Sequence, residues 1–122
     1  MRNGRRKRYS RDFLDFLNSS VDMAHLVKSC IKDRPWFHTS ECRHWKCRCP
    51  FHHESTPSFT VYRDTEQYHC YGCGAHGDVI TFVMEYKRMD FVSAVEFLIK
   101  EYTLWMKWAK HRRKIRKVVE KK

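Results

Sequence analysis

The sequence predicts an α+β fold in which a small antiparallel sheet is flanked by helices. Apolar residues recur at helical spacing over residues 21–31 and again from residue 79 onward. Between these regions, residues 36–68 carry aromatic and β-favouring residues in short runs, as strands do. No stretch resembles an internal repeat or a low-complexity linker, so we expect one domain with two tails.

Two helical segments are expected before the sheet. A short helical turn follows Ser10 and ends at the polar residues 18–20. Ser20 is then placed to cap a helix over residues 21–31, because a serine hydroxyl can accept a hydrogen bond from a free N–H group of the first helical turn. The apolar side chains of that helix share one face: Met23, Leu26, Val27, Cys30 and Ile31.

The expected strands come from four short runs: Trp36-Phe37, Trp45, Phe59–Tyr62 and Gln67–His69. Phe59 and Val61 should lie on one face of their strand, because successive side chains of a strand alternate between its faces. Residues 63–66 are expected to form a hairpin turn.

Three helical segments are expected after the sheet. Asp78 and Asp90 are each placed to cap the helix that follows. The two apolar stripes are Val79, Phe82, Val83 and Tyr86, then Phe91, Val95, Leu98 and Tyr102. Residues 104–119 can continue as a helix with Leu104, Trp108, Ile115 and Val119 on one side.

The charge of the chain points to a polyanionic partner. The formal net charge is +11 and the isoelectric point is near 9.6. Residues 2–8 and 107–122 supply more than half of the 25 lysines and arginines. Nucleic acid is the leading candidate, an anionic membrane surface is the lesser one, and each basic run alone also fits a solubilising tail. We predict no membrane partner and no small-molecule substrate.

The cysteines indicate metal binding in preference to disulfides. No stretch approaches the ~20 apolar residues that span a bilayer. The basic start is followed by Asp12 and Asp15 where a secretory signal would be apolar. We therefore expect an intracellular, cytoplasmic protein whose six cysteines lie in a reducing compartment, where paired cysteines more often bind metal.

Two pairs of residues have the spacing of a zinc site. Cys49 and His52 are separated by two residues, and so are Cys70 and Cys73. This gap lets one tight turn, a zinc knuckle, point both side chains at one ion, and two knuckles at the ends of adjacent strands complete a tetrahedron. Four protein ligands leave no position for water. We therefore predict one structural Zn²⁺ that stabilises a small core and no catalytic metal.

The sequence leaves alternatives open for the ligands. Cys47 or His53 could replace a neighbouring ligand of the first knuckle. A second ion could take its ligands from Cys42, His44, Cys47 and either His38 or His53. Cys30, on an apolar helix face, is expected to be a core residue.

Three stretches carry a resemblance to a known family: Cys49-Pro-Phe-His52, Thr56–Val61 and Tyr68–Val83. They resemble the CHC2 zinc-binding domain of bacterial and phage DnaG-type DNA primases, over about residues 20–102. The resemblance implies a zinc-ribbon fold with Cys49, His52, Cys70 and Cys73 as zinc ligands. It also implies a role in recognising the initiation sequence on single-stranded template DNA, beside a separate TOPRIM-type RNA polymerase domain and with helicase contacts elsewhere.

The chain departs from the family pattern in ways that bear on function. Ser55 and Thr65 stand where the family has basic residues, and Cys47 stands where it has glycine. Only nineteen residues follow residue 103, and no carboxylate cluster is evident for catalytic Mg²⁺. We therefore expect no catalytic residues, and an accessory module that acts with a separate primase, polymerase or helicase protein. A virus, plasmid or other mobile element is the expected source.

The sheet region interleaves aromatic and basic side chains, as surfaces for single-stranded nucleic acid do. Our candidate contacts are Arg43, Trp45, Arg48, Arg63 and Tyr68, with Lys46 and Tyr62 in the same region. The competing interpretation is that Trp45 and Tyr68 are core residues. The C-terminal basic helix is expected to follow phosphates without reading sequence, or to dock through Trp105 and Trp108.

The expected organisation has three parts: a basic arm with a short helical turn (1–18), a CHC2-type zinc-ribbon domain (19–103) and a basic C-terminal helix (104–122). We expect the two ends to stay outside the core. The leading function is a nucleic-acid-binding module of a replication-priming system. The alternatives are a DNA-binding regulator of transcription or copy number, and a replisome protein-interaction adaptor.

Overall fold

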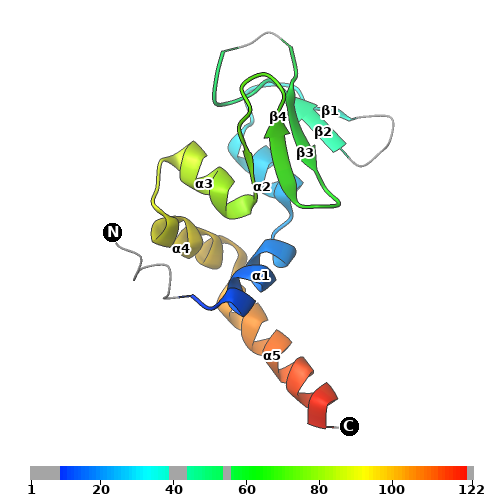
Figure 1. The fold of residues 1–122 in the computed structure, drawn as a ribbon, viewed down its shortest axis with the longest axis vertical. Coiled ribbons are helices and arrows are strands. Elements are labelled where there is room, and N and C mark those ends of the chain that lie inside the picture. The colour runs from blue at the N-terminus through cyan, green and yellow to red at the C-terminus, as the bar shows by residue number, and fades with distance from the viewer. Residues whose placement is uncertain (1–8, 39–43, 54–55, 121–122) are drawn as a thin grey trace.

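The computed structural model describes residues 9–38, 44–53 and 56–120, with side chains described as far as residue 115. The described residues form five helices and five strands (Figure 1). The helices are α1 (Arg11–Ser20), α2 (Met23–Cys30), α3 (Val79–Lys87), α4 (Phe91–Tyr102) and α5 (Leu104–Glu120). The strands are β1 (Phe37–His38), β2 (His44–Cys47), β3 (Phe59–Tyr62), β4 (Gln67–Cys70) and β5 (His76–Gly77). The predicted α+β class is confirmed.

The five strands make one antiparallel sheet in which each strand pairs with the next along the chain. Residues 63–66 form the β3–β4 turn, as predicted, with Tyr62 opposite Gln67. The turn contains no glycine, and Glu66 adopts the left-handed conformation with a φ of 54°. The backbone N–H of Met23 donates to the Glu66 carboxylate at 2.7 Å, which ties this hairpin to the start of α2.

Side-chain caps set the starts of the helices. Ser10 caps α1, and the predicted caps Asp78 and Asp90 accept N–H bonds at the starts of α3 and α4. The predicted cap of the second helix is wrong: Ser20 belongs to α1, and Asp22 caps α2 by accepting from two backbone N–H groups. A carboxylate satisfies these N–H groups and also stabilises the positive end of the helix dipole.

One core joins the sheet to the helices. Phe59, Val61 and Tyr68 are buried on the face of the sheet that α2 and α3 cover, and Phe82 of α3 lies 5.6 Å from the Tyr68 ring (Figure 1). None of the helices in the described ranges combines the length and the apolar character needed to cross a bilayer.

The expectation that the ends stay outside the core is wrong for residue 9 onward and for the start of α5. Tyr9, Phe13, Leu17 and Leu104 are buried in the common core. A ten-residue helix such as α1 is marginal by itself, so it is stabilised by packing its apolar face on a neighbour. Farther along, α5 projects away from the rest of the chain (Figure 1).

Candidate metal centre and nucleic-acid surface

The sheet brings the two cysteine-containing turns together. Cys49 follows the end of β2 by two residues, and Cys70 is the last residue of β4. We expected these strands to be adjacent, but β3 lies between them. Both run antiparallel to β3 and therefore parallel to each other, so their ends lie at the same edge of the sheet, about 10 Å apart. The turns that follow close this distance.

Four side chains converge at this edge: Cys49, His52, Cys70 and Cys73. Their ligand atoms all lie within 4.8 Å of one another. The Sγ atoms of Cys49 and Cys73 are 3.9 Å apart, and the Sγ of Cys70 is 3.9 Å from the Nδ1 of His52. Zn–S bonds of about 2.3 Å in a tetrahedron place two sulfur atoms about 3.8 Å apart. The observed spacing and the soft donor set therefore fit a closed, structural zinc site.

Backbone groups support the sulfur atoms. The N–H of Phe51 donates to the Cys49 sulfur at 3.3 Å, and the N–H of Gly72 donates to the Cys70 sulfur at 3.4 Å. A Cβ atom on Gly72 would lie 2.9 Å from the Nε2 of His52. Glycine at this position thus lets the second turn approach the ligand ring.

The two buried thiols have opposite pKa shifts. Burial would raise the pKa of the Cys70 thiol, but the N–H groups of Cys73 and Gly72 and the Ser58 hydroxyl outweigh it and lower that pKa. Burial, with the neighbouring thiols, raises the pKa of the Cys49 thiol. A divalent cation deprotonates the thiols that coordinate it, so metal binding here releases protons.

The alternative ligands lie outside this cluster. The thiol of Cys47 donates to the carbonyl oxygen of Arg48 at 3.3 Å, away from the four converging atoms. Cys42, which the alternative second ion requires, lies outside the described residues. Cys30 is half-buried on α2, and burial raises the pKa of its thiol.

The model of the CHC2 zinc finger family matches residues 9–114 of this chain. The chain belongs to this family. It therefore carries the zinc-binding domain of DnaG-type primases, with one structural zinc at the four-residue cluster, and the recognition drawn from the sequence is confirmed.

Similar proteins and a similar solved structure support this assignment. A DNA primase of Pasteurella multocida is 47% identical over 88 residues, which are 72% of this chain and 14% of that protein. A DNA primase of Escherichia coli K12 is 38% identical over 97 residues, 80% of this chain and 16% of that protein. The crystal structure of the Aquifex aeolicus primase, comprising zinc binding and RNA polymerase domains, aligns with a TM-score of 0.67 at 29% identity, over 78% of this chain and 22% of that one. The chain thus spans a small part of the relatives it matches.

Two of the candidate nucleic-acid contacts lie on the covered face of the primase zinc-binding domain. Trp45 pairs with Val61, and Val61 pairs with Tyr68, so all three point to the same side of the sheet. Tyr68 is 1% exposed, and a ring without an exposed face cannot stack on a base, so the Tyr68 ring does not offer a stacking surface. The Nζ of Lys28, from α2, lies 3.0 Å from the centroid of the Trp45 ring and occupies its face.

The candidate cations are placed differently. Arg48 and Arg63 are exposed, and Arg43 lies outside the described residues. Arg63 makes a loose ion pair with Asp22, at 3.8 Å, through half-exposed side chains. Both described arginines can therefore meet a phosphate without loss of core packing.

The opposite face of the sheet carries Lys46 and Tyr62, which the sequence placed in the candidate region, together with aromatic side chains that were not named there. Register pairs His44 with Tyr62, and it aligns Lys46, Thr60, His69 and His76 across four strands. We call this the outer face; its residues are Phe37, His44, Lys46, Tyr62, His69 and His76, with Tyr71 next to it. The missed signal was alternation in β2: if Trp45 faces the helices, His44 and Lys46 face outward.

Proposed function

We propose that this chain is the template-binding zinc module of a DNA-priming system and that it binds single-stranded DNA across the outer face. The observation that carries the proposal is the continuous row of aromatic rings on that face. The His44 and Tyr62 centroids are 4.5 Å apart, the Tyr62 and Tyr71 hydroxyls hydrogen-bond, and the His69 ring lies 4.5 Å from Tyr71. Of these rings Tyr71 is exposed and the others are partly exposed. Accessible rings on a sheet with cations at its edge suit a single strand, whose bases stack and whose phosphates need positive charge.

Exposure and charge support the same surface. Phe37 and Tyr71 are 51% and 65% exposed, so both rings are accessible to a ligand. Lys46 lies within the row, and Arg48 follows the same strand. Base stacking on each ring is worth about 1–3 kcal/mol in such surfaces.

Helix α5 is proposed to add affinity that does not depend on sequence. Its exposed cations are Lys107, Lys110, Arg112, Arg113 and Lys114, and the helix points away from the core (Figure 1). Such a helix can neutralise phosphates of the strand beyond the sheet, and the affinity it contributes falls as salt rises.

The polymerisation chemistry is proposed to come from a separate catalytic subunit, with a helicase as a further partner. The structural relative from Aquifex aeolicus combines zinc binding and RNA polymerase domains, and this chain aligns with 22% of it. Adding this chain to a primase polymerase core without a zinc domain should raise the primer yield on single-stranded template. An unchanged yield would count against cooperation with that core.

The test of template binding is fluorescence anisotropy of a labelled single-stranded oligonucleotide with the zinc-loaded protein. We expect the double substitution of Tyr62 and Tyr71 by serine to weaken binding at least tenfold. Phe97→Ala, which removes a half-buried ring from α4, should leave affinity unchanged. Absence of binding at low salt would overturn the proposal. Preference for duplex DNA in competition would favour a transcription or copy-number regulator. Stimulation of the polymerase core by a variant that no longer binds single-stranded DNA would favour a protein-interaction adaptor.

A further inference from the structure

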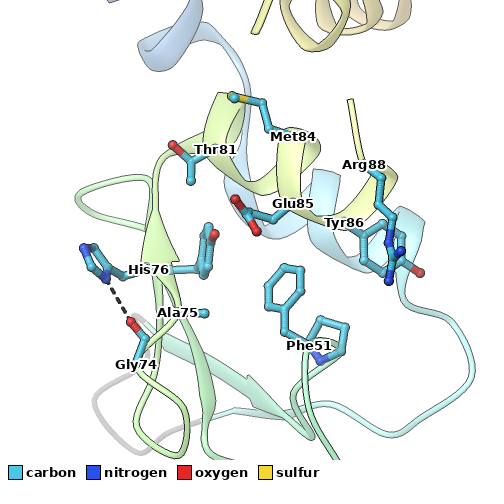
Figure 2. Close-up of a pocket in the computed structure, with 11 residues that line it drawn as sticks. Phe51, Gly74, Ala75, His76, Thr81, Met84, Glu85, Tyr86 and Arg88 are labelled. Atoms are coloured by element: carbon cyan, nitrogen blue, oxygen red, sulfur yellow. Dashed lines mark hydrogen bonds between the residues drawn. The ribbon is translucent and has the colours of Figure 1, made fainter. Parts of the chain in front are cut away.

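A hollow of about 750 Å³ is lined by residues of the two zinc-binding turns and of α3 (Figure 2). Both zinc-binding turns contribute to its wall, through Phe51 and Ala75, and α3 contributes Glu85, Tyr86 and Arg88. Sites for small organic ligands usually have volumes of about 300–1,000 Å³. The metal site therefore fixes the walls of a hollow large enough for a nucleotide.

The wall combines an aromatic surface with a carboxylate. In Figure 2 the Phe51 ring and the Glu85 carboxylate both face the hollow, and Arg88 lies beside Tyr86 at its far side. Glu85 is exposed and accepts hydrogen bonds only, so it suits a ligand that presents N–H donors next to a flat ring.

A buried hydroxyl adds a second observation. The Tyr68 side chain lines the hollow and is 1% exposed. Among the residues that the structure describes, no group forms a hydrogen bond with its hydroxyl. An unpaired buried hydroxyl is unfavourable, and a ligand that entered the hollow could supply the missing partner.

A smaller basic hollow adjoins the first. It has a volume of about 300 Å³ and shares Pro50 and Phe51 with the larger one. Arg34 lines it but is engaged, since it donates to Asp33 and to the carbonyl oxygens of residues 48 and 49. Arg48 and His53 are the exposed basic side chains at this position. An acceptor with negative charge, such as a phosphate, fits them.

We propose that these two hollows bind one guanine nucleotide of a single strand, with the base against Phe51 and Glu85 and the phosphate at Arg48. The inference rests on the proposed function and adds to it a site that recognises one base of the bound strand. Guanine offers adjacent N1–H and N2–H donors that match both oxygens of a carboxylate. Thymine offers a single N–H between two carbonyl oxygens, which a carboxylate repels.

The first test is an NMR titration of the zinc-loaded, ¹⁵N-labelled protein with dGMP and with dTMP. We expect dGMP to shift the amide signals of Phe51, Ala75 and Glu85, and dTMP to bind at least about fivefold more weakly. Equal binding of the two nucleotides, or shifts confined to the outer face, would overturn the inference.

The second test uses variants with matched controls. Glu85→Gln should weaken dGMP binding roughly tenfold, because the amide loses one of its two acceptors and the charge. Glu101→Gln removes an exposed carboxylate from α4, outside the hollow, and should change nothing. Arg48→Ala should weaken dGMP more than the free nucleoside, whereas Lys100→Ala should affect neither.

Tyr68→Phe separates a binding role of the Tyr68 hydroxyl from a purely structural one, because stability and nucleotide binding should change in opposite directions. Removing an unpaired buried hydroxyl should raise the melting temperature of the free protein, yet weaken dGMP binding. Unchanged dGMP binding by both this variant and Glu85→Gln would sink the inference. If the labelled strand still binds through the outer face while dGMP shifts no signal at the hollow, the inference alone fails. If the strand does not bind at all, the proposed function fails.

Discussion

The indole ring of Trp105 stacks on the ring of Phe13, with centroids 4.5 Å apart and planes inclined by 20°. This contact joins a helix near the start of the chain to the last helix. It holds the first turn of α5 against the core, although most of the helix carries exposed cations.

Removing this contact should loosen both ends of the chain. We expect Trp105→Ala to lower the free energy of unfolding by about 1–3 kcal/mol, because it removes the aromatic stack on the buried Phe13 ring. Met106→Ala is the matched control, since Met106 is 70% exposed on the next position of the same helix and should change stability by less than about 0.5 kcal/mol. Thermal denaturation followed by circular dichroism measures both, and equal melting temperatures would show that α5 does not depend on the stack.

Zinc removal should unfold the sheet region. Zinc binding contributes folding free energy on the order of 10 kcal/mol in small zinc domains, which exceeds the stability expected of this core. Cys73→Ser should therefore lose the metal, measured by elemental analysis, and should lose strand signals in NMR spectra. Cys30→Ala, outside the cluster, should retain one equivalent of zinc. A folded, metal-free Cys73→Ser protein would contradict a structural role for the ion.

Lys46 should contribute to the salt dependence of DNA binding. For single strands, each neutralised phosphate adds about 0.7 to the slope of log affinity against log salt concentration. Lys46→Ala should therefore reduce the slope by about 0.7, because Lys46 lies on the proposed DNA-binding outer face together with His69. Lys100→Ala, which removes an exposed charge from α4, should leave the slope unchanged. Titrations at several salt concentrations decide between these outcomes.

Glu66 should make stability depend on pH. Burial raises the pKa of its carboxyl group and outweighs the N–H bond from Met23, so the protonated form is favoured by folding. The stabilisation from that proton is present below the unfolded pKa of about 4.3 and is lost as pH rises through the higher folded pKa. Glu66→Gln keeps an acceptor without the charge, so it should be more stable than the wild type at pH 7.5, and the difference should shrink as pH falls.

Glu66→Ala is the matched variant that removes the acceptor. It should be less stable than the wild type by about 1–2 kcal/mol, because the Met23 N–H then lacks its partner at the start of α2. Chemical denaturation at each pH gives the three stabilities. If the glutamine variant were the least stable of the three, the charged carboxylate of Glu66 would stabilise the folded protein, and the predicted pH dependence would be wrong.

Much of the fold and the metal site followed from local sequence signals. Asp78 and Asp90 cap the helices they were expected to cap, and the turn at residues 63–66 closes the hairpin. The two-residue gaps indicated the four converging ligands, and the resemblance to the CHC2 family distinguished them from the neighbouring Cys47 and His53. These features depend on a few neighbouring residues, so spacing is sufficient to indicate them.

The position of the second helix shows where local signals compete. Ser20 and Asp22 are both good capping residues and lie two positions apart. Asp22 caps α2, and the hairpin delivers Glu66 to the same helix end. A contact between residues 43 positions apart cannot be read from either segment by itself.

The amino-acid order determined which residues alternate along each strand, which aspartates cap α3 and α4, and which side chains are candidates to hold a metal. Only the tertiary structure decided which face of the sheet is covered, and so placed Tyr68 in the core and Tyr62 on the outer face. The reason is that a period of two divides a strand into two sets of side chains without stating which set is buried. The packing of α2 and α3 on one side of the sheet determines which set is buried, and these helices lie far from β3 in the chain.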